Sequence, residues 1–232
     1  MNTVARMSSS GATPVPASLR EAATRVAALA LRPRRSAVLV AISGMDGSGK
    51  THLTRLLAEQ LDRSGVRVAP IGIDPWQHPQ TIRFGSFDPG AHFYRHAIRF
   101  DELFAQVIDP LVANRSLELE TRGIRTDVDV WEPLVYVHHD VEVVLLEGIF
   151  LFRRDLVHRY DLRIWVDCSL ETALRRALER NVENRPVEAL RADYDRIYHA
   201  AQRIHFDLDD PWASSDLLLD NERGTRDREQ WS

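Results

Sequence analysis

The sequence has little of what marks a secreted, membrane-spanning or nucleic-acid-binding chain. Its 232 residues include one cysteine, Cys168, so no disulfide can form within the chain, as is typical of a reducing compartment. No apolar run approaches the roughly 18 residues that a membrane helix needs, and the first residues lack the apolar block of a signal peptide. Its 30 basic and 34 acidic residues leave no positive excess to attract nucleic acid or an anionic membrane. We expect a cytoplasmic protein with neither partner.

The rest of the composition suits one folded domain. Hydrophobic residues make up 44% of the chain, enough for a substantial core at this length. Residues 1–17 are rich in Ser, Ala and Pro, and residues 222–232 are mainly polar and charged, so both are predicted to be flexible tails. Residues 18–221 are predicted to form a single domain that opens with an amphipathic helix.

Five short apolar runs divide this domain. They are predicted to be strands, because short apolar runs are typical of strands that are covered on both faces. The runs span residues 37–42, 66–73, 141–150, 162–167 and 215–221. Helical patterns separate them, and strands that alternate with helices form a parallel sheet. The expected fold class is therefore α/β, doubly wound, with helices on both faces of the sheet.

Two regions do not fit this alternation. Residues 75–135 contain a loop rich in Pro, Gly and aromatic residues, a predicted helix near 93–109 and a less regular stretch. Residues 175–205 are rich in arginine and helical. Because α/β proteins place substrate pockets and lids at the carboxyl ends of their strands, the first region is predicted to be an acceptor-side insertion and the second a lid.

A glycine-rich loop follows the first apolar run. Gly44, Gly49, Lys50 and Thr51 match G-x-x-x-x-G-K-[ST], with a predicted strand before the loop and a predicted helix after it. Backbone N–H groups of such a loop bind phosphates, the lysine reaches the β- and γ-phosphates, and the hydroxyl ligates Mg²⁺. The predicted nucleotide-binding residues are Gly44, Asp46, Gly47, Ser48, Gly49, Lys50, Thr51 and His52. The side chain of Asp46 is assigned no chemistry.

Three acidic residues end later apolar runs. Glu147 is predicted to ligate Mg²⁺ together with the loop hydroxyl, the alternative being an ordinary acidic residue at a strand end. Asp167 is its rival, but Ser169 follows and favours a helix cap there. Asp74 precedes Pro75, so it either activates an acceptor hydroxyl as general base or only begins an Asp-Pro turn.

Cations for a moving phosphoryl group come from the lid region. Arg176 and Arg180 are four residues apart, where like charges repel, whereas Arg175 can pair with neighbouring glutamates. Binding of phosphate would explain two neighbouring arginines without acidic partners, and a solvated basic face is the alternative. We predict that Arg176 and Arg180 stabilise the transferring phosphate. Two further arginines are weaker candidates: Arg185 and Arg203.

Other phosphate-loop reactions fit the sequence less well. A GTPase would need a guanine-reading N-K-x-D, which is missing, and a D-x-x-G where this chain has "EGIF". The nine histidines show no spacing of the H-E-x-x-H kind, which argues against zinc.

The motifs in their order resemble the uridine kinase-like P-loop kinases, the group of uridine-cytidine kinase, phosphoribulokinase and pantothenate kinase. The similar segments are "SGMDGSGKT", "IDPWQHP", "FDPGAHF", "LLEGIFLF", "DLRIWVD", "RRALERN" and "QRIHFDLDDPWASSDLLLDN". The resemblance implies a three-layer P-loop NTPase fold with a five-stranded parallel sheet in the order 2-3-1-4-5. It also implies use of ATP and Mg²⁺, with Asp74 as general base, Glu147 near the metal, and Arg176 and Arg180 on the lid.

The acceptor side departs from that family. The chain has "DPWQ" where uridine-cytidine kinases carry an Asp-Ser-Phe-Tyr-like run, and their nucleoside contacts are not evident in residues 121–139. Acceptor contacts are predicted at five residues, each of which has surface or core packing as the alternative: Asp74, Trp76, Arg83, Tyr94 and Arg125. Arg122 belongs with them as a phosphate-binding candidate.

We therefore predict an ATP- and Mg²⁺-dependent kinase in which Lys50, Asp74, Arg176 and Arg180 are catalytic. Its partner is a small-molecule hydroxyl acceptor, nucleoside-like by resemblance, and a homodimer or higher homo-oligomer is a further expectation. Two alternatives remain open: a nucleoside monophosphate kinase, and a regulatory protein that hydrolyses ATP slowly.

Overall fold

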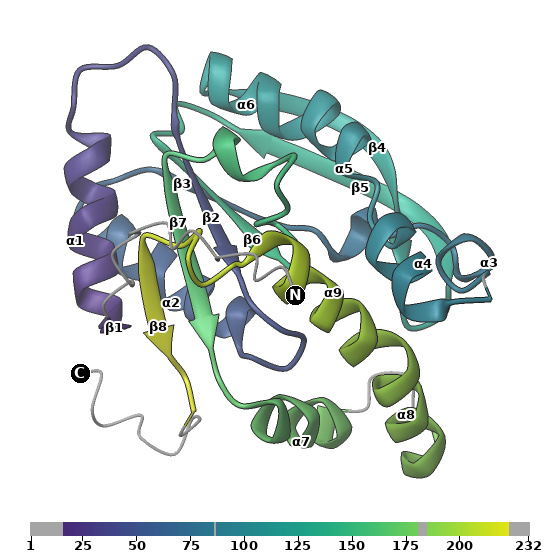
Figure 1. Cartoon of the computed structure of the whole chain (residues 1–232). Helices are drawn as coiled ribbons and strands as arrows, with labels where there is room; N and C mark the ends of the chain where they lie inside the picture. Colours follow the sequence, from purple (N-terminus) through teal and green to yellow (C-terminus); the bar gives the residue numbers. More distant parts are fainter. Residues whose placement is uncertain (1–15, 86, 181–184, 223–232) are drawn as a thin grey trace, which may run out of the picture.

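The computed structural model describes residues 16–85, 87–180 and 185–222, and its centre is a parallel sheet (Figure 1). The strands lie in the order β1 (Pro16–Ala17), β8 (Leu217–Asp220), β7 (Leu162–Asp167), β2 (Val38–Ser43), β6 (Val143–Gly148) and β3 (Val68–Gly72). Each neighbouring pair is parallel. The five predicted strands are confirmed in the order 2-3-1-4-5, with β1 added at the edge beside β8.

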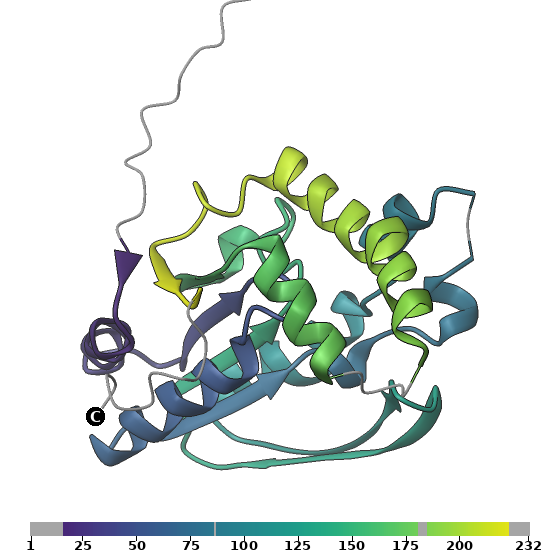
Figure 2. The same cartoon turned by 90° about the horizontal axis from the view of Figure 1, so that it is seen from below.

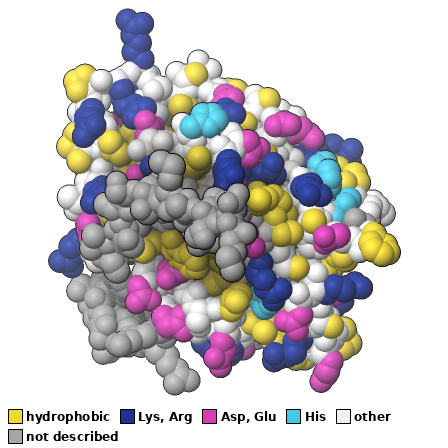
Figure 3. Space-filling model, in the orientation of Figure 1, with side chains coloured by type: hydrophobic (Ala, Val, Ile, Leu, Met, Phe, Trp, Pro, Cys, Tyr) yellow, Lys and Arg dark blue, Asp and Glu magenta, His cyan; other side chains and the backbone are white. Residues whose placement is uncertain are grey.

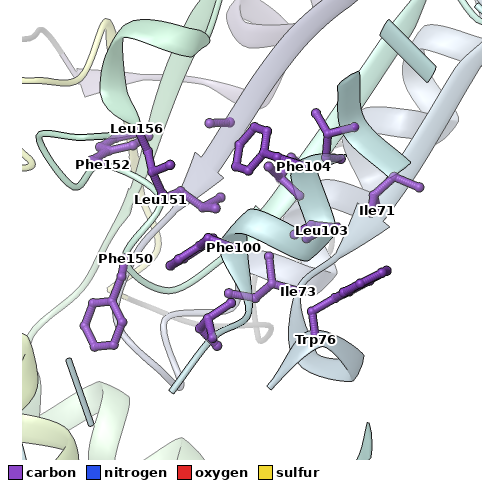
Figure 4. Close-up of a cluster of buried hydrophobic side chains, with 14 of the residues drawn as sticks. Ile71, Ile73, Trp76, Phe100, Leu103, Phe104, Phe150, Leu151, Phe152 and Leu156 are labelled. Carbon is purple, nitrogen blue, oxygen red and sulfur yellow. The ribbon is translucent and has the colours of Figure 1, made fainter. Parts of the chain in front are cut away.

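Helices cover both faces of the sheet, which makes three layers. Alternate residues of β2 face opposite sides, so Val40 packs with α1 (Leu19–Ala30) and α2 (Lys50–Arg63), whereas Leu39 and Ala41 face the opposite core. That second core is rich in aromatic residues and includes the side chains drawn in Figure 4, among them Trp76 and Phe104. The complete burial of β2 explains its continuous apolar sequence.

The acceptor-side insertion contains short helices instead of one. They are η1 (Asp74–Trp76), α3 (Gln80–Arg83), α4 (Pro89–His96), α5 (Phe100–Leu103), a π-helical stretch η2 (Phe104–Ile108) and α6 (Asp109–Asn114). The helix predicted near 93–109 is broken where Ile98 forms an isolated antiparallel bridge with Gln77. This bridge ties the insertion to the segment that follows β3.

The stretch predicted to be less regular is an antiparallel hairpin, and that prediction is wrong. Strands β4 (Leu117–Arg125) and β5 (Val130–His138) pair along their whole length and lie outside the central sheet (Figures 1 and 2). Their exposure alternates along each strand, as expected where one face packs on the protein and the other faces water.

The lid region and the chain end complete the fold. The helices are α7 (Leu170–Arg180), α8 (Val187–Asp193), a π-helical stretch η4 (Tyr194–Tyr198) and α9 (His199–Asp209), and a short turn η3 (Val157–Arg159) precedes β7. No helix within the described residues is both long and apolar enough to cross a membrane. Basic and acidic side chains are interspersed on the face shown in Figure 3.

At both ends of the domain, part of a predicted tail belongs to the fold. Residues 16–17 form β1, and Ser18 caps α1 by accepting a hydrogen bond from the Glu21 N–H at 3.1 Å. Glu222, placed in the C-terminal tail, makes the contacts with α7 described below. The remainder of both predicted tails, 1–15 and 223–232, lies outside the described residues.

Candidate active site

The glycine-rich loop joins β2 to α2 and has a backbone that only glycine fits. Gly47 and Gly49 have φ of +79° and +92°, in the left-handed region. A Cβ on Gly47 would lie 2.2 Å from the carbonyl oxygen of Ala173, and one on Gly49 2.3 Å from the Asn221 side chain. The cradle is therefore enclosed by α7 and by the end of β8, and it fits the phosphate-binding loop that the motif predicts.

Lys50 and Thr51 stand at the first turn of α2, beside the end of β6. Lys50 is buried, and its ammonium donates to the Met45 carbonyl at 2.8 Å across the loop. β2 and β6 pair with Ile42 beside Glu147, and the Thr51 hydroxyl donates to a Glu147 carboxylate oxygen at 3.1 Å. The parallel register thus brings together the two predicted magnesium ligands, which lie 96 positions apart in the sequence.

The pair of Thr51 and Glu147 fits Mg²⁺ better than it fits a metal ion that is coordinated by protein groups alone. Within the described ranges no group of three or more His, Cys, Asp and Glu side chains is arranged to hold a metal ion. Mg²⁺ needs no such cage, because it keeps several waters and binds one or two protein oxygens together with substrate phosphates. A hydroxyl and a carboxylate beside a phosphate cradle supply that donor set.

Asp74 follows β3 and faces the same cradle. Its carbonyl accepts the Gln77 N–H at 3.3 Å, so it does begin a turn. Asp74 is exposed at the molecular surface, yet the protein around its carboxylate raises its pKa, and the charge of Lys50 opposes this rise. Burial likewise raises the pKa of Glu147, against the charge of Lys50. The two roles considered for Asp74, turn initiator and functional carboxylate, are therefore compatible.

Asp46 has a role in the site that the sequence did not reveal. Arg180 on α7 donates to its two carboxylate oxygens at 2.9 and 3.2 Å, and the Tyr194 hydroxyl also donates to it. Burial favours the neutral acid, yet the charges of Arg180 and Lys50 together with the Tyr194 hydrogen bond hold the pKa of Asp46 below its ordinary value. The prediction that Arg180 is unpaired is wrong, because its partner lies 134 positions away.

Arg176 is engaged by the end of the chain. Its guanidinium donates to the carbonyls of Asn221 at 2.7 Å and Glu222 at 3.3 Å, and the Asn221 amide donates to the Ser48 carbonyl at 2.7 Å. Arg176 is therefore not unpaired either: in this structure it braces the phosphate loop through Asn221. Arg175 pairs with Glu179 at 3.1 Å, as predicted.

The amino end of α7 is held by hydroxyl and carboxylate groups. The Ser169 hydroxyl accepts the Thr172 N–H at 3.1 Å, which confirms the predicted cap. Glu222 accepts from the Ser169 N–H at 2.5 Å and from its hydroxyl at 2.8 Å. Asp167 instead accepts from the indole N–H groups of Trp165 and Trp212, at 3.2 and 3.1 Å. The weaker candidate Arg185 pairs with Asp193 at 2.6 Å.

A small hollow of about 20 Å³ adjoins the loop beside Asp46. Its walls come from the loop, α4, the segment after β6, α7, η4 and α9: Met45, Asp46, Phe93, Ile149, Phe150, Leu170, Ala173, Tyr194, Tyr198, His199 and Gln202. Gln202 is 5% exposed, and its amide nitrogen has no hydrogen-bond partner among the residues that the structure describes. A buried donor without a partner on the wall of a cavity is what a ligand with an acceptor atom would satisfy.

The other predicted acceptor contacts have partners within the fold. Trp76 is fully buried and donates to the Tyr136 hydroxyl at 2.9 Å. The remaining three pair with carboxylates: buried Arg83 with Asp129 at 3.4 Å, Tyr94 with Asp209 at 2.5 Å, and exposed Arg125 with Asp127 at 3.0 Å. Arg122 lies over the Trp131 ring at 5.8 Å. Packing and pairing thus account for the positions of these side chains, and acceptor contacts at them stay a prediction.

The fold and the site define a class: a nucleotide-binding α/β protein built around a phosphate loop, with a carboxylate and a hydroxyl beside that loop. The sequence pattern of the phosphoribulokinase / uridine kinase family matches residues 39–203, well over half of the chain, so the chain belongs to that family. The resemblance noted from the motifs is confirmed, and membership of a kinase family supports the expectation of a kinase.

Individual relatives agree on the fold. The chain is 28% identical over 165 residues to uridine kinase of Saccharomyces cerevisiae, a match that covers 66% of this chain but 30% of the yeast protein. A "possible uridine kinase" structure from Bacillus stearothermophilus superposes with a TM-score of 0.68 at 18% identity, covering 87% of this chain and 99% of that one. D-glycerate 3-kinase from Cryptococcus neoformans has a TM-score of 0.59 at 12% identity, covering 87% and 95%. These structures share the fold.

Proposed function

We propose that the protein is an ATP- and Mg²⁺-dependent kinase that transfers the γ-phosphate to a hydroxyl of a small molecule. The observation that carries the proposal is the convergence of Lys50, Thr51, Asp74 and Glu147 on one phosphate cradle. Phosphoryl transfer needs positioned cations, a metal and a base near the acceptor oxygen, and these residue types supply each of them.

Each residue then has a distinct role. Lys50 neutralises charge on the β- and γ-phosphates, while Thr51 and Glu147 would hold Mg²⁺, which would supply further positive charge to the phosphates. Asp74 accepts the acceptor's proton, and its raised pKa brings it nearer to neutral pH, which favours general-base catalysis. Arg176 and Arg180 are the lid cations that stabilise charge on the transferred group.

The hollow beside Asp46 is the proposed acceptor pocket, and it must widen to admit an acceptor, because it has room for little more than one water molecule. Aromatic and apolar side chains form most of its wall, and the Gln202 amide is a buried polar donor without a partner in the described part of the chain. Such a wall suits a planar or apolar group that carries a hydrogen-bond acceptor. Because relatives at 26–28% identity are named uridine kinase, nucleosides are the first acceptors to test.

The testing experiment measures ADP release with ATP-Mg²⁺ and a panel of nucleosides, nucleoside monophosphates, sugars and hydroxy acids. We expect one hydroxyl compound to stimulate release, and we expect Asp74→Asn to abolish that stimulation while nucleotide affinity changes less than twofold to threefold, since the amide keeps the shape but cannot accept the proton. Release that no acceptor stimulates would instead favour the slow ATP-hydrolysing regulator. Stimulation by a monophosphate alone would favour the nucleoside monophosphate kinase.

A further inference from the structure

Asp46 places a negative charge inside a loop that binds a polyanion. A carboxylate a few ångströms from bound phosphate repels it by an energy that grows as the site loses water. The loop needs glycines for its backbone, but nothing in its phosphate-binding geometry needs an acid at this position. Asp46 therefore either only weakens nucleotide binding or has a role that depends on a nearby cation.

The structure supplies that cation. Arg180 is the last residue of α7, and its guanidinium donates to the two carboxylate oxygens of Asp46 at 2.9 and 3.2 Å. The Arg180 side chain is 54% exposed and the Asp46 side chain 37% exposed. Tyr194, buried at the start of η4, donates its hydroxyl to the same carboxylate. One side chain of the loop thus joins both parts of the lid that flank residues 181–184.

The same guanidinium lies within range of the proposed chemistry. Its charge acts on Asp74, the proposed base, as well as on Asp46. A guanidinium has five donors in a planar fork and binds carboxylate and phosphate in the same bidentate manner. The γ-phosphate of bound ATP, with its larger charge, is a competitor of Asp46 for Arg180.

We propose that Asp46 is a positioning residue that holds Arg180 over the phosphate loop before nucleotide binds and releases it to the γ-phosphate. This rests on the proposed function in one respect, that the bound nucleotide is ATP. Two effects follow that oppose each other. Asp46 costs nucleotide affinity, because its charge repels phosphate and occupies the arginine, and it raises turnover, because Arg180 is already in place.

The test is Asp46→Asn, which keeps the size of the side chain and removes its charge. Titration calorimetry with a non-hydrolysable ATP analogue and Mg²⁺ should show a dissociation constant about threefold to tenfold lower than that of the unmodified protein, the range for one partly exposed charge. In the acceptor assay kcat should fall by a factor of about ten or more, as for lost electrostatic positioning. Unchanged or weaker analogue binding would overturn the proposal.

Two variants separate this role from simple loss of structure. Tyr194→Phe removes a donor but leaves the Asp46 charge, so kcat should fall without tighter analogue binding. Glu179→Gln is the matched control, because Glu179 is an exposed residue that partners Arg175 on the same helix at 3.1 Å. This control should change neither quantity by more than about twofold, as for an exposed helix pair.

A double variant tests the link to Arg180 directly. If Asp46 acts on turnover through Arg180, Asp46→Asn should lower kcat little further in an Arg180→Gln background, since the group it positions is gone. Additive losses would contradict the proposal. If no acceptor is ever phosphorylated but Asp46→Asn still tightens analogue binding, the proposed kinase activity fails while the competition for Arg180 stands.

Discussion

At Gly47 the backbone of the phosphate loop and that of the lid helix come into direct contact. Its φ is +79°, and a Cβ would meet the Ala173 carbonyl oxygen at 2.2 Å. We predict that Gly47→Ala lowers affinity for the ATP analogue at least tenfold, because loop and α7 must separate to admit the methyl group. Calorimetric titration measures this loss.

Gly65 offers a matched control for Gly47. It has the same φ of +79°, but no atom lies within 4 Å of the position its Cβ would take. Gly65→Ala should cost about 1 kcal/mol of unfolding free energy from backbone strain alone and leave analogue affinity unchanged. If Gly47→Ala behaved as Gly65→Ala does, close packing of loop and lid would not be what makes glycine necessary.

The residues that sequence could predict are those whose role is set by local backbone chemistry. The phosphate loop can be recognised from the consecutive residues Gly44 to Thr51, and Ser169 caps the helix that begins next to it. The pairing of Asp46 with Arg180 joins residues far apart in the chain, and no local spacing encodes it. The signal available in the sequence was the acidic residue Asp46 inside a phosphate loop, because a carboxylate at that place needs a cation nearby.

Among the elements, the hairpin β4–β5 is joined to the turn that carries Asp74 by the Trp76–Tyr136 hydrogen bond and by Arg99. Arg99 is 6% exposed and lies between the Trp76 and Trp131 rings, at 5.0 and 4.8 Å from their centres. It also donates to the Pro75 carbonyl at 3.3 Å, one residue after the proposed base. The position of the Asp74 turn therefore depends on the hairpin.

We predict that Arg99→Lys lowers the unfolding free energy by about 1–3 kcal/mol, because lysine keeps the charge but loses the planar fork and its stacking. It should also lower kcat more than it alters analogue affinity, since the turn serves the acceptor side. Urea unfolding and the acceptor assay measure the two effects. Arg125→Lys, an exposed hairpin arginine paired with Asp127, is the control and should change neither.

Element prediction succeeded where burial is complete and failed where it is partial. β2 and β6 are covered on both faces and read as continuous apolar runs. The hairpin is half exposed, with Glu118 and Glu120 outside and Leu119 inside, and it contains Pro133 and Gly123, which weaken a strand signal. Its pairing is set by contacts with the insertion, which the sequence of either strand does not contain.

Across the whole molecule, Asp209 connects the insertion, the lid region and the segment after β6. Its carboxylate accepts from the Tyr94 hydroxyl on α4 at 2.5 Å, from the Arg154 N–H at 3.0 Å and pairs with His205 at 2.7 Å. Burial alone would raise its pKa, but the hydrogen bonds from His205, Tyr94 and Arg154 hold it below the ordinary value. The charged form of Asp209 therefore stabilises the folded state.

The sign of the resulting pH dependence follows from that lowered pKa. A carboxylate whose folded-state pKa lies below its unfolded value contributes stability above the unfolded value, 3.8 for Asp, and loses it as pH falls through the folded-state pKa.

We predict that Asp209→Asn costs about 1–3 kcal/mol of unfolding free energy at neutral pH, as for loss of a buried charged acceptor. The deficit should narrow as pH falls below about 4, because the unfolded chain then takes up a proton at Asp209 that the folded protein takes up only at lower pH. Asp207→Asn, an exposed change on the same helix, should show neither the deficit nor its pH dependence. Urea unfolding at several pH values compares the three proteins, and a deficit for Asp209→Asn that stays constant down to about pH 3 would mean that its charge does not hold these three elements together.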